Sequence, residues 1–124
     1  MTSREFNRAV FQVAAIYDGL LGVLFFVAPN WPFHLFNVAE PNHPAYVQFP
    51  GALLVIFATM FLKIAREPAQ YRHLIPYGIA LKAAYCVLAF WYWWNPGIPG
   101  MWKTFAVIDL VMALLFVQAY QSDR

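Results

Sequence analysis

The segment AVFQVAAIYDGLLGVLFFVA, residues 9–28, contains twenty residues, of which only Asp18 is charged. A helix that crosses the roughly 30 Å apolar core of a bilayer needs about 20 mostly apolar residues, and this segment meets that requirement. A cleavable signal peptide would have a shorter apolar region, followed by a cleavage site of small residues. Because the segment instead ends at Val27-Ala28-Pro29-Asn30, it is predicted to be a retained transmembrane helix.

The composition agrees with a membrane protein. The 124 residues are 62% hydrophobic and 11% charged, whereas soluble domains are about 45–50% apolar and about 25% charged. The net charge of +2 is small and dispersed, so a nucleic-acid partner is not expected. Cys86 is the only cysteine, which excludes an intrachain disulfide and a multi-cysteine metal site.

The predicted fold class is all-α, an integral membrane four-helix bundle that forms a single domain over residues 1–124. The predicted spans are residues 8–27, 46–66, 74–94 and 102–120. Prolines and glycines separate them, and residues 95–100 are predicted to form a tight turn. We also expect a short interfacial helix at Trp31–Phe36, and we expect Pro50 to lie in the first turn of the second span.

The distribution of Lys and Arg predicts the orientation. Basic residues gather before the first span, between the second and third spans, and at the C-terminus: Arg4, Arg8, Lys63, Arg66, Arg72 and Arg124. By the positive-inside rule both termini are expected on the cytoplasmic side of the cell (inner) membrane. All five tryptophans fall at the opposite boundary: Trp31, Trp91, Trp93, Trp94 and Trp102. This placement favours an aromatic belt over a ligand-stacking cage.

Three charged side chains lie near the middle of three predicted spans: Asp18, Lys82 and Asp109. A charge at bilayer depth is costly unless it is paired or hydrated. Each residue lies close to the midpoint of its span, so their depths differ by about 3 Å or less at 1.5 Å per residue. A lysine side chain bridges that difference, and we therefore predict that the three side chains meet inside the protein.

The neighbouring residues support a shared interior. Small residues occur one turn from the charges, as at Gly22, Gly78 and Cys86, and they let membrane helices approach closely. Cys86 is therefore interpreted as a packing residue. Other polar residues complete the predicted ligand- or ion-binding site and a polar seam toward the two membrane surfaces: Tyr85, Gln48, Thr59 and Gln118, with Gln12 at the inner side. Tyr17 adjoins Asp18 but is expected to point to another side of its helix.

Two interpretations of the triad stay open. It is either a structural ion pair that fixes which faces of the helices meet, or a site that accepts a proton, couples an ion or anchors a small polar or cationic ligand. One lysine balances one aspartate, so the second aspartate needs a proton, a cation or a ligand. This excess of acid favours the site.

No metal site, cofactor or catalytic centre is expected. His34, His43 and Glu40 could in principle bind a divalent metal, but their spacing matches no compact motif, and a surface loop is favoured. The chain has no G-x-S-x-G, P-loop, H-E-x-x-H or C-x-x-C-H motif. An enzyme is therefore the least favoured class.

The chain resembles small bacterial four-span proteins of the DoxX-like type. The matching features are a first span with Gly19 and Gly22 that ends at Ala28-Pro29, the segment Phe49-Pro-Gly-Ala-Leu-Leu, and the inner turn at residues 65–72. The resemblance implies a membrane protein that acts as a partner of other subunits, and no functional residue is carried over. A fainter likeness to sterol-binding four-span proteins, which also place acids among their helices, implies a ligand pocket.

Three functions follow, in order of preference. The first is binding or transport of a small solute or lipid-like ligand at the polar centre, with proton coupling through the acid that Lys82 does not neutralise. The second is a non-catalytic accessory subunit of a larger membrane complex, in which the triad only holds helices together. The third is an enzyme acting on a lipid or isoprenoid substrate. The expected partners are the lipid bilayer, a second copy of the chain or another membrane subunit, and a small-molecule ligand.

Overall fold

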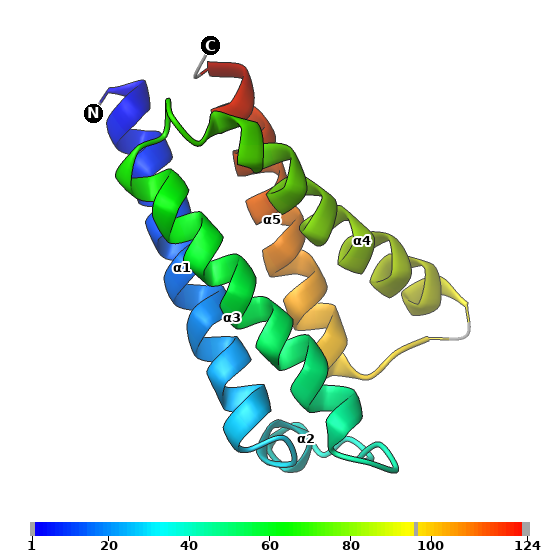
Figure 1. The fold of residues 1–124 in the computed structure, drawn as a ribbon. Coiled ribbons are helices and arrows are strands. Elements are labelled where there is room, and N and C mark those ends of the chain that lie inside the picture. Colours follow the sequence, from blue (N-terminus) through cyan, green and yellow to red (C-terminus); the bar gives the residue numbers. More distant parts are fainter. Residues whose placement is uncertain (1, 96, 123–124) are drawn as a thin grey trace.

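The computed structural model describes residues 2–95 and 97–122, and Figure 1 shows their fold. The elements are α1 (Ser3–Val27), α2 (Trp31–Leu35), α3 (Ala45–Arg66), the 3-10 helix η1 (Arg72–Leu74), α4 (Ile75–Trp94) and α5 (Gly100–Ser122). There is no strand in the described part of the chain. Within it, α1, α3, α4 together with η1, and α5 are long and apolar enough to cross a membrane, as expected of a multi-pass membrane protein.

Most helix bounds agree with the sequence expectations, with two differences. The first helix begins at Ser3 because Thr2 and Glu5 form a capping box, which satisfies free backbone N–H groups ahead of the apolar segment.

Pro50 does not lie in a first turn, because α3 already begins at Ala45; that expectation is wrong. The short helix expected at Trp31–Phe36 is present as α2, Trp31–Leu35. Pro96, within the predicted tight turn, and Arg124, used for the orientation, lie outside the described residues.

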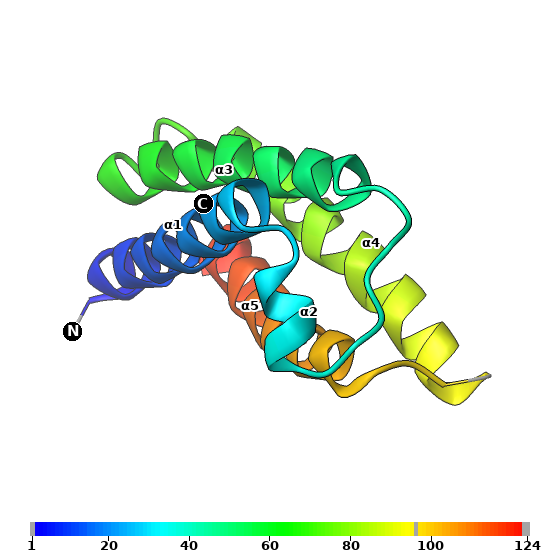
Figure 2. The ribbon, with the colours of Figure 1, turned by 90° about the horizontal axis from the view of Figure 1, so that it is seen from below.

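The helices form two closely packed pairs. Helix α1 packs along α3, and α4 packs on α5. Both chain ends lie at one end of the molecule, here called the terminal end, while α2 lies at the other, here called the α2 end (Figure 1). Seen from below in Figure 2, α4 runs away from α1 and α3. Helices α3 and α4 accordingly have few contacts with each other.

Glycine allows the close contact between α1 and α3. A Cβ atom added to Gly22 would lie 2.6 Å from the backbone oxygen of Gly51, and one added to Gly51 would lie 2.9 Å from the oxygen of Gly22. Neither position therefore accommodates a larger residue without moving a helix. Close approach at small residues is how helices associate in membranes, where lipid removes the usual hydrophobic drive.

An aromatic cluster joins three helices at the terminal end. Phe11 of α1 stacks on Phe116 of α5 with ring centroids 4.7 Å apart, and Phe61 of α3 lies 5.1 Å from Phe116. All three side chains are fully buried. A second, smaller cluster at the α2 end contains Phe25, Phe33, Val47 and Met101. The space between these two clusters holds the charged residues.

Candidate functional site

The three charged side chains near the midpoints of the predicted spans meet, as the sequence predicted. Lys82 of α4 donates hydrogen bonds from Nζ to both carboxylate oxygens of Asp18 in α1, each at 2.8 Å. The same Nζ donates to Oδ1 of Asp109 in α5 at 3.0 Å. The Lys82 ammonium group thus contacts carboxylate oxygens of both aspartates.

Small residues of α4 bring Lys82 into the interior. The buried residues of this helix recur every three or four positions: Ile75, Gly78, Lys82, Cys86 and Ala89. A Cβ atom added to Gly78 would lie 2.7 Å from the ring of Phe61, so the glycine lets α4 approach the aromatic cluster. Cys86 is buried, with its Sγ 3.7 Å from the backbone oxygen of Ala106, in agreement with a packing residue.

The two aspartates occupy different environments. The side chains of Lys82 and Asp18 are 0% and 1% exposed, whereas that of Asp109 is 13% exposed. Asp18 uses both oxygens on Lys82, but Oδ2 of Asp109 accepts no hydrogen bond from the residues that the structure describes. With both acids ionised, the triad carries one uncompensated negative charge. Of the two acids, Asp109 is the accessible one.

Asp109 is accessible because it lines a cavity of about 990 Å³. The cavity lies between α1, α3, α4 and α5, and the α2–α3 connection borders it at the α2 end. Its walls are mainly apolar and aromatic, from Leu21, Phe25, Phe33, Phe36, Val38, Val47, Leu53, Leu54, Leu81, Trp102 and Phe105. The polar groups at its inner end are Asp18, Asp109, Tyr17 and Tyr85. The arrangement is that of an apolar pocket with a small polar base.

The cavity is open along the side where α4 diverges from α3. Tyr46, Pro50 and Leu53 of α3 line it and are exposed at the same time. On the opposite wall α4 contributes Leu81 and Tyr85. Toward the terminal end, the buried rings of the aromatic cluster close the interior.

Tyr17 corrects the sequence expectation, because it faces the cavity together with Asp18. Its ring centroid lies 5.6 Å from Lys82 Nζ. Its hydroxyl is buried and has no hydrogen-bond partner within the described residues. Successive residues of a helix point about 100° apart. The cavity beside α4 is nevertheless wide enough for Tyr17 and Asp18 both to line it. Nothing in the local pattern around Tyr17 indicates this.

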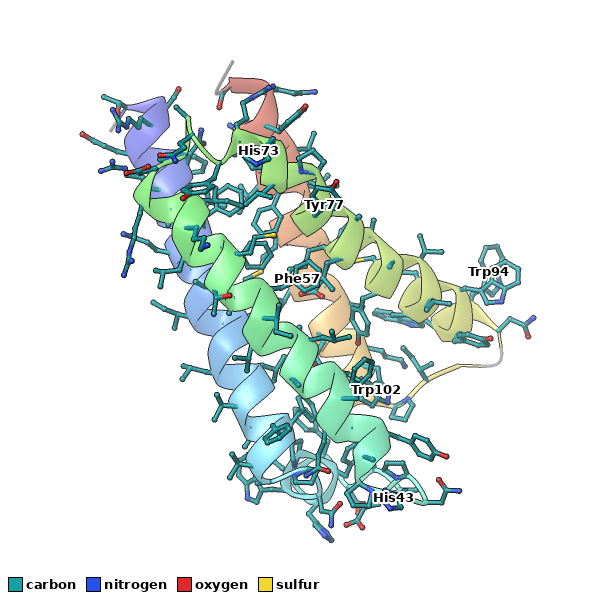
Figure 3. The ribbon with its side chains drawn as sticks, in the orientation of Figure 1. His43, Phe57, His73, Tyr77, Trp94 and Trp102 are labelled. Carbon is teal, nitrogen blue, oxygen red and sulfur yellow. The ribbon has the colours of Figure 1, made fainter. Side chains whose placement is uncertain are left out.

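Tyr85 lines the cavity, and its hydroxyl donates to the backbone oxygen of Trp102 at 2.9 Å. Trp102 is half-buried and also lines the cavity, unlike Trp94, which is exposed at the tip of α4 (Figure 3). The remaining tryptophans, Trp31, Trp91 and Trp93, are exposed.

The structure does not bring the other members of the predicted polar seam to the triad. Gln48 donates to the backbone oxygen of Phe26 at the end of α1. Thr59 is exposed and donates to the oxygen of Ile56 within its own helix. Gln118 is exposed, and so is Gln12. The cavity lining includes none of these residues.

His34 of α2 and His43 of the α2–α3 connection have separate partners. His34 Nε2 lies 2.6 Å from Glu40 Oε1, while His43 Nδ1 accepts a hydrogen bond from the backbone N–H of Ala45 at the start of α3. Within residues 2–95 and 97–122, no group of three His, Cys, Asp or Glu side chains is placed to hold a metal ion.

No protein-family model matches the chain, and no curated protein and no solved structure matches it either. The resemblance to DoxX-like proteins therefore stays a prediction. The chemistry of the site has to be argued from its own geometry, which offers a large apolar cavity, a buried ion pair, and one accessible carboxylate.

Proposed function

We propose that this chain binds a small lipid-like molecule in the cavity, with the polar group of that molecule at Asp109. The observation that carries this proposal is a cavity of about 990 Å³ whose apolar walls lead to one carboxylate oxygen without a hydrogen-bond partner among the described residues. Ligand pockets in proteins commonly have volumes of about 300–1,000 Å³ and combine apolar walls with a few polar groups. A ligand with an apolar body and a polar head would match these apolar walls and the polar group at Asp109.

The opening between α3 and α4 supports a ligand that comes from the bilayer. Its border residues Tyr46, Pro50 and Leu53 belong to a helix that is apolar enough to cross the membrane. In a bilayer such an opening faces lipid. A ligand dissolved in the membrane would then enter sideways without crossing a polar surface.

The closed terminal end favours binding over transport across the membrane. Phe11, Phe61 and Phe116 are fully buried between the triad and that end. Proton-coupled movement of a solute, with Asp109 as the proton carrier, would require this aromatic cluster to open.

Photocrosslinking in nanodiscs tests the proposal. An alkyl probe that carries a diazirine should label cavity residues such as Phe105, and Leu54→Trp should reduce this labelling because the indole occupies the cavity. Leu88→Trp is the matched control, since Leu88 is 60% exposed on the lipid-facing side of α4. Labelling of the cavity no stronger than that of lipid-facing residues, and unchanged in Leu54→Trp, would contradict the proposal.

We also propose a four-helix bundle in the cell (inner) membrane with the terminal end in the cytoplasm. The support is that Arg8, Lys63, Arg66 and Arg72 lie on segments at that end, where the positive-inside rule places them. Reporter fusions test the orientation: a fluorescent protein fused to the C-terminus should be bright, whereas a fused periplasmic phosphatase should be inactive. The reverse pattern would overturn it.

The accessory-subunit hypothesis is the second candidate, and the complete burial of Lys82 favours it. A buried ion pair that joins two helices is sufficient to fix how they face each other. The two hypotheses require different residues. Helix packing in an accessory subunit requires Asp18 and Lys82, whereas ligand binding also requires Asp109. Loss of ligand binding in a folded Asp109 variant therefore separates them.

A further inference from the structure

We propose that the ligand is a monocationic amphiphile, a protonated amine on an apolar body, whose ammonium group binds Asp109. This inference rests on the proposed function and specifies the chemistry of the ligand. It follows from the charges, the free acceptors and the aromatic rings of the cavity.

The charges that line the cavity are all negative. Its ionisable acids are Asp18, Glu40 and Asp109, and no Lys, Arg or His of the described chain lines it. Lys82 lies behind the two aspartates and is 0% exposed. It neutralises one of them, so the inner end of the cavity carries one negative charge when both are ionised. A ligand with a single positive charge completes the balance, whereas a carboxylate or phosphate head would be repelled.

The hydrogen-bonding groups left at the inner end are mainly acceptors. The Lys82 ammonium group is 0% exposed and its Nζ is hydrogen-bonded to carboxylate oxygens of both aspartates, so it is not available to a ligand. The accessible group without a partner among the described residues is Oδ2 of Asp109, which only accepts. The Tyr17 hydroxyl also lacks a partner among them but is buried. The ligand must therefore bring hydrogen-bond donors. A primary or secondary ammonium group brings two or more.

Aromatic rings surround the same region. Tyr17, Tyr85 and Phe105 line the cavity together with Asp109, and Trp102 lines it further toward the α2 end. A cation within about 6 Å of an aromatic ring is attracted by the negative charge of the ring face. Tyr17 already has this relation to Lys82, at 5.6 Å. The rings thus favour a cationic head while they remain compatible with an apolar body.

Three probes of one shape test the inference: 1-aminoadamantane, 1-adamantanol and 1-adamantanecarboxylate. Binding to the full chain in phosphatidylcholine nanodiscs is measured by calorimetry and corrected with empty nanodiscs. We expect the amine to bind at least about tenfold more tightly than the alcohol, the advantage typical of a charge-assisted hydrogen bond, and the carboxylate not to bind. Asp109→Asn should remove the preference for the amine, and Glu67→Gln, an exposed acid at the end of α3, is the matched control.

The outcomes separate the two proposals. Equal binding of alcohol and amine, or stronger binding of the carboxylate, would overturn the cationic ligand and leave the cavity as a binding site. Loss of amine binding in Glu40→Gln but not in Asp109→Asn would also overturn it, because the anchor would then lie at the α2 end of the cavity. Binding of none of the three probes would count against both proposals. The order of affinities in the unmodified chain decides the matter even if Asp109→Asn does not fold.

Discussion

Replacement of each charged residue in turn should destabilise the protein in the order Lys82→Met, Asp18→Asn, Asp109→Asn. Lys82 has three hydrogen bonds, Asp18 takes part in two of them and Asp109 in one. The side chains are 0%, 1% and 13% exposed, in the same order. The structure therefore ranks the three residues by both the number and the burial of their interactions.

The expected magnitudes follow from the charges that each change leaves behind. Lys82→Met leaves two carboxylates without a counter-charge, and breaking a buried pair in this way costs about 3–5 kcal/mol. Asp18→Asn weakens two charge-assisted hydrogen bonds but leaves Lys82 paired with Asp109, at a cost of about 2–3 kcal/mol. Asp109→Asn loses one bond and also removes the uncompensated charge, so the net cost should be below about 1 kcal/mol.

Reversible unfolding in mixed micelles measures these free energies, with the detergent composition varied and tryptophan fluorescence or circular dichroism as the signal. Lys63→Met and Glu67→Gln are the controls, because both residues are exposed, and each should change stability by less than about 0.5 kcal/mol. If Asp109→Asn costs as much as Asp18→Asn, the division into a packing pair and an accessible acid is refuted. If Lys82→Met costs less than about 1 kcal/mol, the ion pair does not hold the helices together.

Two further predictions concern packing. Gly22→Ala should lower stability by about 1–3 kcal/mol, because its Cβ would lie 2.6 Å from a backbone oxygen of α3. Gly19→Ala should be neutral or stabilising, because the atom nearest to its added Cβ is 3.4 Å away. Equal shifts of the thermal midpoint for Gly22→Ala and Gly19→Ala would contradict the close contact between α1 and α3 at Gly22. Tyr85→Phe should lower the free energy of unfolding by about 1 kcal/mol, because the hydrogen bond from its hydroxyl to α5 is lost. The control Tyr77→Phe, at an exposed position, should have no measurable effect. An unfolding midpoint of Tyr85→Phe equal to that of the unmodified chain would show that this hydrogen bond is unimportant.

The part of the candidate site that could be predicted from the sequence is the pairing of the charged residues, because it depends on their position along each apolar span. Asp18, Lys82 and Asp109 lie at the midpoints of apolar segments, and the cost of an isolated charge leaves pairing as the main way to keep them there. The same reasoning fails for Gln48, Thr59 and Gln118. A neutral polar side chain can satisfy itself on a nearby backbone oxygen, as Gln48 and Thr59 do, so its presence in a span does not require an interior position.

The sequence by itself determined the four apolar helices, the breaks between them and the meeting of one base with two acids, because these depend on local hydropathy and on the cost of charge in lipid. Only the tertiary structure decided that α4 diverges from α3, that a cavity remains between them, and that Tyr17 and Asp109 face it. The physical reason is that the rotation and crossing of helices depend on contacts between distant residues, such as Gly22 with Gly51 and Gly78 with Phe61. Hydropathy is the same whichever way such contacts turn a helix.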